Sequence, residues 1–352
     1  MAGGAVLAVS PRLARAQERA LPFTDLGASR TRVTTHAALA RALGLGSLHV
    51  KRDDESGAEF GGSKARKLER LLGAARRERR DAVLTFGGVG SNHALATAIH
   101  ARRLGMRAHL VLLHEPPSPH VRRHLLAALH AGAELHAGTR ADRDVPGRAV
   151  ARFAAADDPY VIPPGGTSGL GGVGYVDAAL ELRRQIDAGA LPAPDAIYVA
   201  AGTTGTAAGL WVGLQAAQLP ARLIAVRASG RATASRARVQ TEVDAIEATL
   251  RGTDATFAAA PLDDRFELEH RFAGEGYARP TDAGRRARAL AGSAFPLDDT
   301  YTAKAFAALV ARAGAHRGRP VLFWDTFDPR RPPIGAARVE DLPRRLRAYA
   351  RE

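Results

Sequence analysis

Two lysines, Lys64 and Lys67, lie in a segment whose residue types suit covalent chemistry at an amine. The segment reads FGGSKARKLE over residues 60–69, where two glycines allow a tight turn and Ser63 is predicted to cap a helix that Lys64 opens. The positive end of a helix disfavours an ammonium ion and therefore favours the neutral, nucleophilic form of Lys64. Because the two lysines are three residues apart, they share a helix face, so that one could bond covalently while the other meets an anion. The alternative is an ordinary amphipathic helix with a solvated basic face.

Lysine is scarce in this chain. Of 50 Lys and Arg residues only four are lysines, namely Lys51, Lys64, Lys67 and Lys304, and the remaining 46 are arginines. An arginine stays protonated, whereas a buried lysine can lose its proton and attack a carbonyl carbon. The four lysines are therefore candidates for work that a guanidinium group cannot do.

A glycine-rich turn precedes a second group of polar residues. In TFGGVGSNHALATA (85–98), Ser91, Asn92 and His93 stand at the start of a predicted helix, where exposed backbone N–H groups suit a carboxylate or a phosphate. The alternative for this segment is that Ser91 or Asn92 only caps the helix and that His93 lies on the surface.

A third loop offers a cradle for phosphate. IYVAAGTTGTAAGL (197–210) supplies small residues, N–H donors and hydroxyls between a strand and a helix, at Gly202, Thr203, Thr204, Gly205 and Thr206. It lacks the GK[ST] of a Walker loop and the GxGxxG of a dinucleotide site, and a purely structural turn is the alternative. A helix-start lysine, an anion site and a phosphate cradle are together what pyridoxal phosphate requires.

The elements that must position these loops alternate between strand and helix. Strands are predicted at 48–52, 82–86, 108–113, 196–200, 222–227 and 321–324, and helices at 64–79, 91–104, 121–131, 175–188, 206–217 and 236–251. Nearly continuous apolar strands alternating with helices predict an α/β fold, with parallel sheets covered by helices on both faces. Ligands of such sheets bind beyond the carboxyl ends of the strands, so several of these loops could converge on one site.

Composition limits the classes of protein. The 352 residues suggest about two domains, and the absence of cysteine excludes disulfides, thiolate metal sites and a cysteine nucleophile; no metal site is predicted. The longest apolar runs are strand-sized, and GAVLAV (4–9) is too short for a signal-peptide core, which predicts a soluble, cytoplasmic protein without membrane contact. The net charge of +14 comes from arginines spread along the chain with only 5% aromatic residues, so no specific nucleic-acid partner is expected, although nucleic-acid binding remains the rival from another class.

The order of these motifs, from about residue 45 to 326, closely resembles the fold-type-II (tryptophan synthase β-like) pyridoxal-phosphate enzymes that comprise 1-aminocyclopropane-1-carboxylate deaminase and D-cysteine desulfhydrase. The resemblance implies that Lys64 is the Schiff-base lysine and that Lys67 and residues 202–206 bind the phosphate. It also implies that Asn92 binds the ring hydroxyl oxygen, and that the substrate carboxylate is received by Ser91, which is also a catalytic candidate, together with Asn92 and His93. Tyr277 in GEGYARP and Tyr301 in DDTYTAK are similar to the family's two active-site tyrosines.

Two positions distinguish the branches of that family. Where the deaminases carry a glutamate facing the pyridine nitrogen, this chain has Thr302. In the late strand motif it has a threonine, Thr326, as the desulfhydrases do, and we expect Thr326 to bind the cofactor. Hydroxyls hold the ring nitrogen protonated less well than a carboxylate, which favours β-elimination over opening of a cyclopropane ring. The leading expectation is therefore D-cysteine conversion to pyruvate, ammonia and sulfide. Cyclopropane deamination, another amino-acid lyase or deaminase, and a weakly active cofactor-binding homologue are the alternatives.

One motif departs from the family. The usual HTGG is here Asp325, Thr326, Phe327 and Asp328, a change expected to reshape the ring-nitrogen side of the pocket. The resemblance further implies a large domain of residues 1–66 plus 164–352, a small domain of residues 67–163 with the cofactor in the cleft, and a homodimer.

Overall fold

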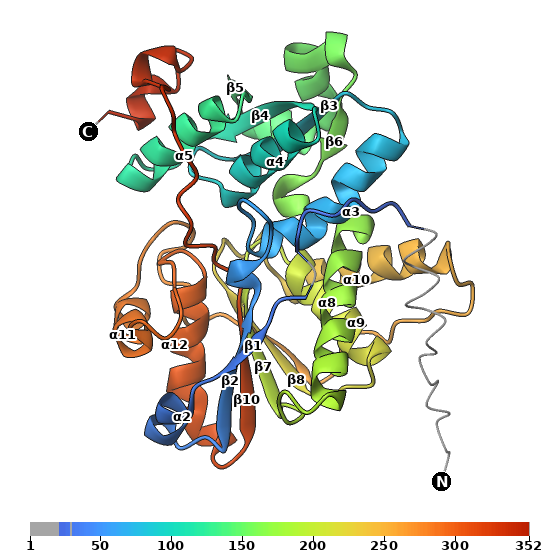
Figure 1. Ribbon diagram of the computed structural model, residues 1–352, viewed down its shortest axis with the longest axis vertical. Helices are drawn as coiled ribbons and strands as arrows, with labels where there is room; N and C mark the ends of the chain where they lie inside the picture. The colour runs from blue at the N-terminus through green and yellow to red at the C-terminus, as the bar shows by residue number, and fades with distance from the viewer. Residues whose placement is uncertain (1–20, 29, 352) are drawn as a thin grey trace.

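The chain builds two open, twisted sheets, which lie one above the other in the computed structural model (Figure 1). The structure describes residues 21–28 and 30–351. The six-stranded sheet has the order β1 (Val33–Thr35), β2 (Ser47–Arg52), β10 (Pro320–Asp325), β7 (Ala196–Ala201), β8 (Arg222–Arg227) and β9 (Phe266–Glu269), and its strands are parallel except for β1. The four-stranded sheet is wholly parallel, in the order β5 (Glu134–Ala137), β4 (Arg107–Leu113), β3 (Ala82–Gly88) and β6 (Tyr160–Ile162).

Alternate residues of each strand of the larger sheet enter different cores, because successive side chains point to opposite faces. On β7, Ile197 and Val199 pack into one core while Tyr198 and Ala200 pack into the other. The first core is covered by α8 (Gly169–Asp187), α9 (Gly205–Ala216) and α10 (Arg236–Arg251), and the second by α2 (Ala37–Leu43), α11 (Asp282–Ala291) and α12 (Thr302–Arg312).

The smaller sheet is covered in the same way. Val83 of β3 packs under α3 (Ser63–Arg77), α4 (Asn92–Arg103) and α5 (Pro119–His130), whereas Leu84 and Phe86 pack under α7 (Pro146–Ala149) and a π-helical turn, Val150–Ala154. A short helix, α6 (Arg140–Asp144), precedes α7. The predicted α/β class with two parallel sheets and helices on both faces is confirmed.

The predicted strands and helices are all present, and the differences have local causes. The strands β1, β5, β6 and β9, of three or four residues each, were not predicted because they are too short to show an apolar pattern. Helix α8 begins at Gly169 rather than near residue 175. Its first turns were not predicted because they are rich in glycine, which disfavours a helix. The glycines allow close helix packing: a Cβ on Gly174 would lie 2.2 Å from the carbonyl oxygen of Arg66.

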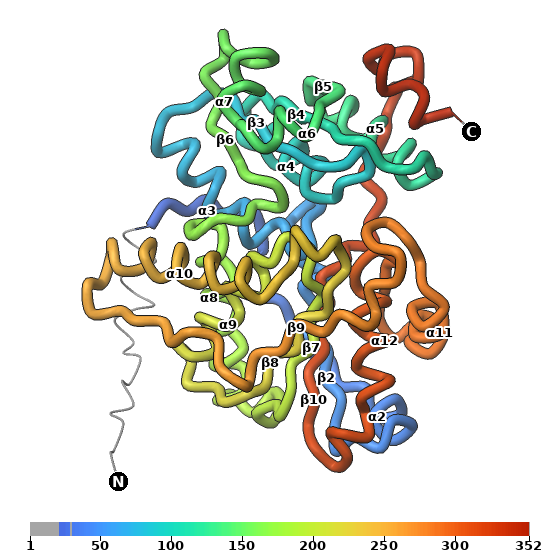
Figure 2. The backbone as a smooth tube through the Cα atoms, turned by 180° about the vertical axis from the view of Figure 1, so that it is seen from behind, coloured from blue at the N-terminus to red at the C-terminus, as the bar shows by residue number. Residues whose placement is uncertain are grey.

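The C-terminal segment crosses from one layer to the other. Figure 2 shows it running beside α5, and Leu342, Leu346 and Ala350 belong to the core of the smaller sheet. The predicted division assigns this tail to the large domain, residues 1–66 plus 164–352, although it packs on the small domain, residues 67–163. The tail thus connects the two parts, and the division itself stays a prediction. Among the described residues, no helix combines the length and apolar character that a membrane span requires.

A buried ionic network ties α3 to the larger sheet. Arg66 donates to Asp53 at 2.8 Å and to Glu181 at 3.0 Å, and Lys51 pairs with the same Glu181. Asp53 also accepts hydrogen bonds from Trp324 on β10 and from Tyr175 on α8, and it is fully buried. The network fixes the start of α3, where Lys64 lies, against strand ends from the other layer.

Candidate active site

A cavity of about 330 Å³ lies where the carboxyl ends of β3, β4, β7, β8 and β10 meet the start of α3. Parallel strands present their ligand-binding loops at this edge, as expected from the sequence. Twelve of the predicted site residues line the cavity: Lys64, Lys67, Ser91, Asn92, His93, Gly202, Thr203, Thr204, Thr206, Tyr277, Tyr301 and Thr326. The thirteenth, Gly205, lies behind the wall, where a Cβ would be 3.1 Å from Lys67 Nζ.

Lys64 lies in the first turn of α3, at the carboxyl end of β10. The helix begins at Ser63 with Gly62 before it, so Ser63 does not cap it as predicted; its hydroxyl instead contacts Lys64 Nζ at 2.6 Å. Gly62 has φ 54°, and a Cβ there would meet the carbonyl oxygen of Thr326 at 2.4 Å, so the tight turn requires glycine. Burial lowers the pKa of Lys64 to about 8, against an opposing effect of Asp298.

We expect the rate at which Lys64 attaches to an aldehyde to depend on pH with a midpoint near 8. Only the neutral amine attacks a carbonyl, so the rate should rise about tenfold per pH unit below the pKa of about 8 and level off above it. The measurement is the absorbance change when saturating pyridoxal phosphate is added to cofactor-free protein across this pH range. A midpoint at the ordinary lysine value of 10.5 would contradict the assignment.

Lys67 faces the predicted phosphate cradle. It is 2% exposed, its Nζ donates to the carbonyl oxygen of Gly165 at 3.3 Å, and burial, with the nearby charge of Lys64, lowers its pKa to about 7. No side chain caps α9, which leaves backbone N–H groups at its start available, and Thr204 before it has φ 69°. An anion at this place would meet both the helix N-terminus and an ammonium group, so the residues present fit a phosphate.

Substituting Gly205 with alanine should weaken cofactor binding by about 30-fold, since the lost or bent phosphate contact is worth about 2 kcal/mol. The added Cβ would approach Thr167 Oγ1 at 2.9 Å and Lys67 Nζ at 3.1 Å. The matched control is Gly147→Ala, because a Cβ on that helical glycine would meet no atom of other described residues, apart from its chain neighbours and its own helix backbone, within 4 Å. Affinity is measured by fluorescence titration with pyridoxal phosphate; equal affinities of the two variants would contradict the cradle.

The Ser91–Asn92–His93 group lies at the start of α4, on the opposite wall. Ser91 caps the helix by accepting a hydrogen bond from Ala94 N at 3.3 Å, and it also lines the cavity. Asn92 Oδ1 accepts from His124 Nε2 at 2.8 Å, which leaves its amide N–H₂ free to donate to a ligand.

His93 is 2% exposed, so the alternative that it lies on the surface is wrong. Its Nε2 contacts Thr85 Oγ1 at 3.0 Å, and its Nδ1 is buried with no hydrogen-bond partner among the described residues. Burial and the charges of Lys64 and Lys67 hold its pKa well below the ordinary value, so the imidazole is neutral.

Tyr277 and Tyr301 meet edge to face across the cavity, with ring centroids 5.6 Å apart. Burial raises the pKa of both phenols, so both remain protonated donors. Lys64 Nζ lies 6.0 Å from the centre of the Tyr301 ring, which places an amine and a phenol on the same side of the cavity.

Glu115, at the end of β4, is a cavity residue that sequence reasoning missed. It is 7% exposed, its Oε2 accepts from Gly90 N at 2.8 Å, and burial raises its pKa despite that bond and the nearby Tyr277. Space for it comes from two glycines, because a Cβ on Gly88 would lie 1.9 Å from Glu115 Oε1. The glycines in GGVG were the available signal, but only the fold shows which side chain they accommodate.

Thr302 and Thr326 differ in their access to the cavity. Thr326 lines it, whereas Thr302 is fully buried with its hydroxyl donating to Asp298 Oδ1 at 2.7 Å. Asp298, also missed from the sequence, lines the cavity and accepts further hydrogen bonds from the backbone of residues 300–302. Its charge is thus largely satisfied by local donors.

The last residue of the motif that departs from HTGG, Asp328, anchors the loop before Lys64. Asp328 accepts from Gly61 N at 2.7 Å and forms a salt bridge with Arg330 at 2.6 Å, and Arg330 donates in turn to the carbonyl oxygens of Ser56 and Gly57. The acidic residue that replaces a glycine is therefore paired, and it holds the glycine turn rather than adding an unpaired charge to the pocket.

The other two lysines have structural contacts. Lys51 is held in the buried ionic network, and Lys304 donates to the carbonyl oxygens of Ala273 at 2.9 Å and Gly276 at 2.7 Å, directly before Tyr277. Scarcity of lysine therefore pointed to the active site for Lys64 and Lys67 but not for these two.

Comparisons with known proteins agree with this geometry. A family model described as "Pyridoxal-phosphate dependent enzyme" matches residues 24–326. The fold and the site thus define a pyridoxal-phosphate-dependent enzyme. Within that class the chain belongs to the fold-type-II family that comprises 1-aminocyclopropane-1-carboxylate deaminase and D-cysteine desulfhydrase.

Individual relatives differ in their activities. A nocardicin C-9′ epimerase of Nocardia uniformis subsp. tsuyamanensis is 38% identical over 80% of this chain and 86% of its own length, and a D-cysteine desulfhydrase of Salmonella schwarzengrund is 36% identical over 79% and 86%. The crystal structure of an ACC deaminase homologue superposes with a TM-score of 0.76 at 28% identity, over 97% of this chain and 99% of that one. A serine racemase from Dictyostelium discoideum, at 15% identity and a TM-score of 0.63, shares the fold.

Proposed function

We propose that the protein catalyses β-elimination from D-cysteine, which with one water gives pyruvate, ammonia and hydrogen sulfide. The support is the 36% identity to a D-cysteine desulfhydrase together with the size of the cavity. A volume of about 330 Å³ is at the lower end for ligand pockets, which suits a small amino acid beside the cofactor.

The residues around the cavity divide the work. Lys67 and residues 202–206 would hold the phosphate, Asn92 the ring oxygen, and Lys64 the aldehyde carbon. The bound cofactor would supply an electron sink that stabilises negative charge at the substrate Cα.

Proton transfer falls to three side chains. The Lys64 amine would take the proton from the substrate Cα, and its pKa of about 8 keeps a useful fraction of the amine neutral near pH 7. Tyr277 and Tyr301, whose raised pKa values keep them protonated, donate to the leaving sulfur. The substrate carboxylate is received by Ser91, Asn92 and the N–H groups at the start of α4.

The observation that carries elimination, rather than opening of a cyclopropane ring, is the hydroxyl at Thr326 on the cavity wall. The glutamate position of the deaminases is Thr302, whose hydroxyl is already bonded to Asp298. A pyridine nitrogen facing a hydroxyl is held protonated less firmly, and loss of a good leaving group needs less storage of negative charge than ring opening does.

The test is release of pyruvate and sulfide from a panel of D-cysteine, L-cysteine, D-serine and 1-aminocyclopropane-1-carboxylate. We expect D-cysteine to give the highest kcat/KM and sulfide in equal amount to pyruvate. Pyruvate from L-cysteine alone would refute the stereochemistry, and 2-oxobutanoate from the cyclopropane substrate would place the protein with the deaminases. Normal cofactor absorbance without any product would indicate a weakly active homologue.

Epimerisation at Cα is the second candidate. It is favoured by the 38% identity to a nocardicin epimerase and by the presence of two proton-carrying groups, Lys64 and the Tyr277–Glu115 pair, around one cavity. Exchange of the α-proton with deuterated solvent, accompanied by interconversion of D- and L-forms without keto-acid release, would establish it in place of elimination.

We also propose that the protein acts as a cytoplasmic homodimer without a specific nucleic-acid partner. The proposal follows the family resemblance and the scatter of arginines along the chain. Light scattering of the purified protein tests the dimer. Tight association with DNA that shows a steep salt dependence and a sequence preference would overturn the statement about nucleic acid.

A further inference from the structure

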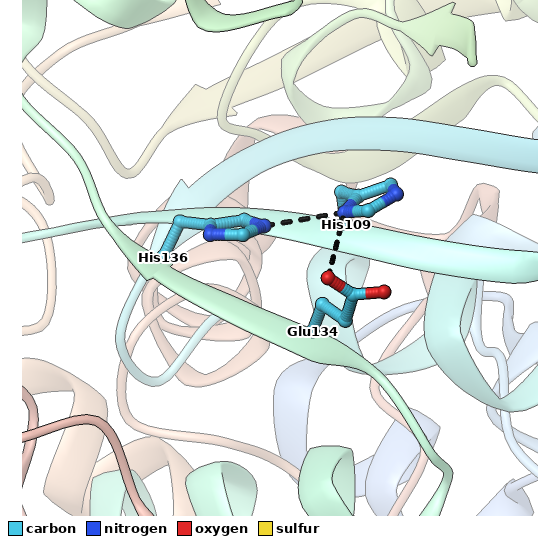
Figure 3. A group of neighbouring side chains, drawn as sticks. All are labelled: His109, Glu134 and His136. Atoms are coloured by element: carbon cyan, nitrogen blue, oxygen red, sulfur yellow. Dashed lines mark hydrogen bonds and ion pairs between the residues drawn. The ribbon is translucent and has the colours of Figure 1, made fainter. Parts of the chain in front are cut away.

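A group of metal-ligating side chains lies on the smaller sheet, outside the cavity. His109 on β4 is directly opposite Glu134 on β5, and His136 is two residues further along β5. Residues two apart on a strand share a face, so the three side chains gather on one side of the sheet edge (Figure 3). None of the three lines the active-site cavity.

The spacing of their ligand atoms suits a tetrahedral ion. His109 Nδ1 is 3.2 Å from His136 Nε2 and 3.5 Å from Glu134 Oε2, and all three atoms lie within 4.8 Å of one another. Zinc binds nitrogen and oxygen at about 2.0–2.2 Å, so two ligands of one tetrahedral ion are about 3.4 Å apart. Two of the three separations are already at that value.

A further carboxylate fixes the orientation of His109. Its Nε2 contacts Asp157 Oδ2 at 2.5 Å, and Arg107 holds the other oxygen of Asp157 at 2.6 Å. A carboxylate on one ring nitrogen keeps the proton there and turns the other nitrogen, as a lone pair, toward a metal. The buried His109 therefore directs Nδ1 at Glu134 and His136.

His136 is oriented by packing. Its ring stacks on Phe153, with centroids 4.5 Å apart and planes 22° apart. Glu134 is 54% exposed, so its carboxylate leaves a path from solvent.

We propose that His109, Glu134 and His136 bind one divalent transition-metal ion of the zinc class, with water as the fourth ligand. Two imidazoles and one carboxylate match the nitrogen and oxygen ligands that zinc accepts. The ion replaces the proton now shared between the two facing imidazole nitrogens. It joins β4 to the edge strand β5 and so acts as a structural staple of the smaller sheet, independent of the reaction in the cavity.

The experiment uses the cofactor-loaded protein, dialysed against a chelator and then titrated with Zn²⁺ in a calorimeter. We expect one ion per chain, a raised melting temperature with Zn²⁺, and a visible spectrum of tetrahedral type when Co²⁺ is the probe. Glu134→Gln, at an exposed position where folding is not at risk, should weaken binding at least about tenfold, as should Asp157→Asn through His109. His130→Ala, a half-buried histidine on α5, is the control and should leave binding unchanged.

Two results would overturn the proposal. The first is the lack of stoichiometric Zn²⁺ or Co²⁺ binding, which would leave the cluster as an ion pair and a histidine–histidine hydrogen bond only. The second is binding that is equal in wild type, Glu134→Gln and His136→Ala, which would place the ion elsewhere. Pyruvate release is expected to be unchanged in Glu134→Gln, because Glu134 lies outside the cavity. Metal binding is measured directly, so the test stands even if the protein does not catalyse the proposed elimination.

Discussion

Replacing Lys64 with alanine is expected to lower kcat/KM for the proposed elimination by at least about 10³-fold, because it removes the amine that we propose as both covalent anchor and base. The cofactor should still bind at the phosphate cradle, since Lys67 and the start of α9 are untouched. The measurements are pyruvate release and the visible absorbance of the lysine-bound cofactor, which the variant should lack.

Lys64→Arg is the matched control for charge. It keeps a cation at the start of α3, but a guanidinium stays protonated and cannot act as nucleophile or base. We therefore expect it to be as inactive as the alanine variant. Recovery of activity in Lys64→Arg, or a normal lysine-bound absorbance in Lys64→Ala, would remove Lys64 from the mechanism.

Substituting Asp53 with alanine is expected to lower the free energy of unfolding by about 3–5 kcal/mol, because it leaves the buried Arg66 without a main partner. Burial by itself would raise the pKa of Asp53, but Arg66 and Lys51 outweigh it and hold the pKa below the ordinary 3.8. The stabilisation is thus present above pH 3.8 and is lost as the pH falls through the lowered value. Urea unfolding of the wild type and the variant at neutral pH measures the difference.

The control for this stability prediction is Asp187→Ala. Asp187 is also paired with an arginine, Arg183 at 2.8 Å, but both side chains are largely exposed. Exposed pairs contribute about 0–1 kcal/mol, so the control should unfold close to wild type. Similar losses of unfolding free energy in the two variants would mean that the buried network stabilises the fold no more than an exposed ion pair does.

The sequence showed the site most clearly where chemistry is local. A glycine pair before a lysine, and small residues with hydroxyls between a strand and a helix, identify Lys64 and the 202–206 loop because turn geometry and free N–H groups depend on a few adjacent residues. The bounds of β8 were predicted to the residue, because a run of apolar residues is also a local pattern.

Contacts between distant segments were beyond the sequence. Glu115 fills the space left by Gly88, Asp298 binds the hydroxyl of Thr302, and Asp328 holds the turn at Gly61, and in each case the chain must fold before the partner is known. The same holds for the tail at Leu342. It packs on the smaller sheet, although the strand that precedes it, β10, belongs to the larger sheet.

The sequence by itself thus determined the fold class and the cofactor and pointed to Lys64 as the candidate lysine, since periodicity and turn chemistry act over a few residues. Only the tertiary structure decided which carboxylates enter the cavity, which lysines are structural, and that His109, Glu134 and His136 meet on neighbouring strands. The physical reason is that strand register and the packing of one layer on another set these distances, and no local pattern records them.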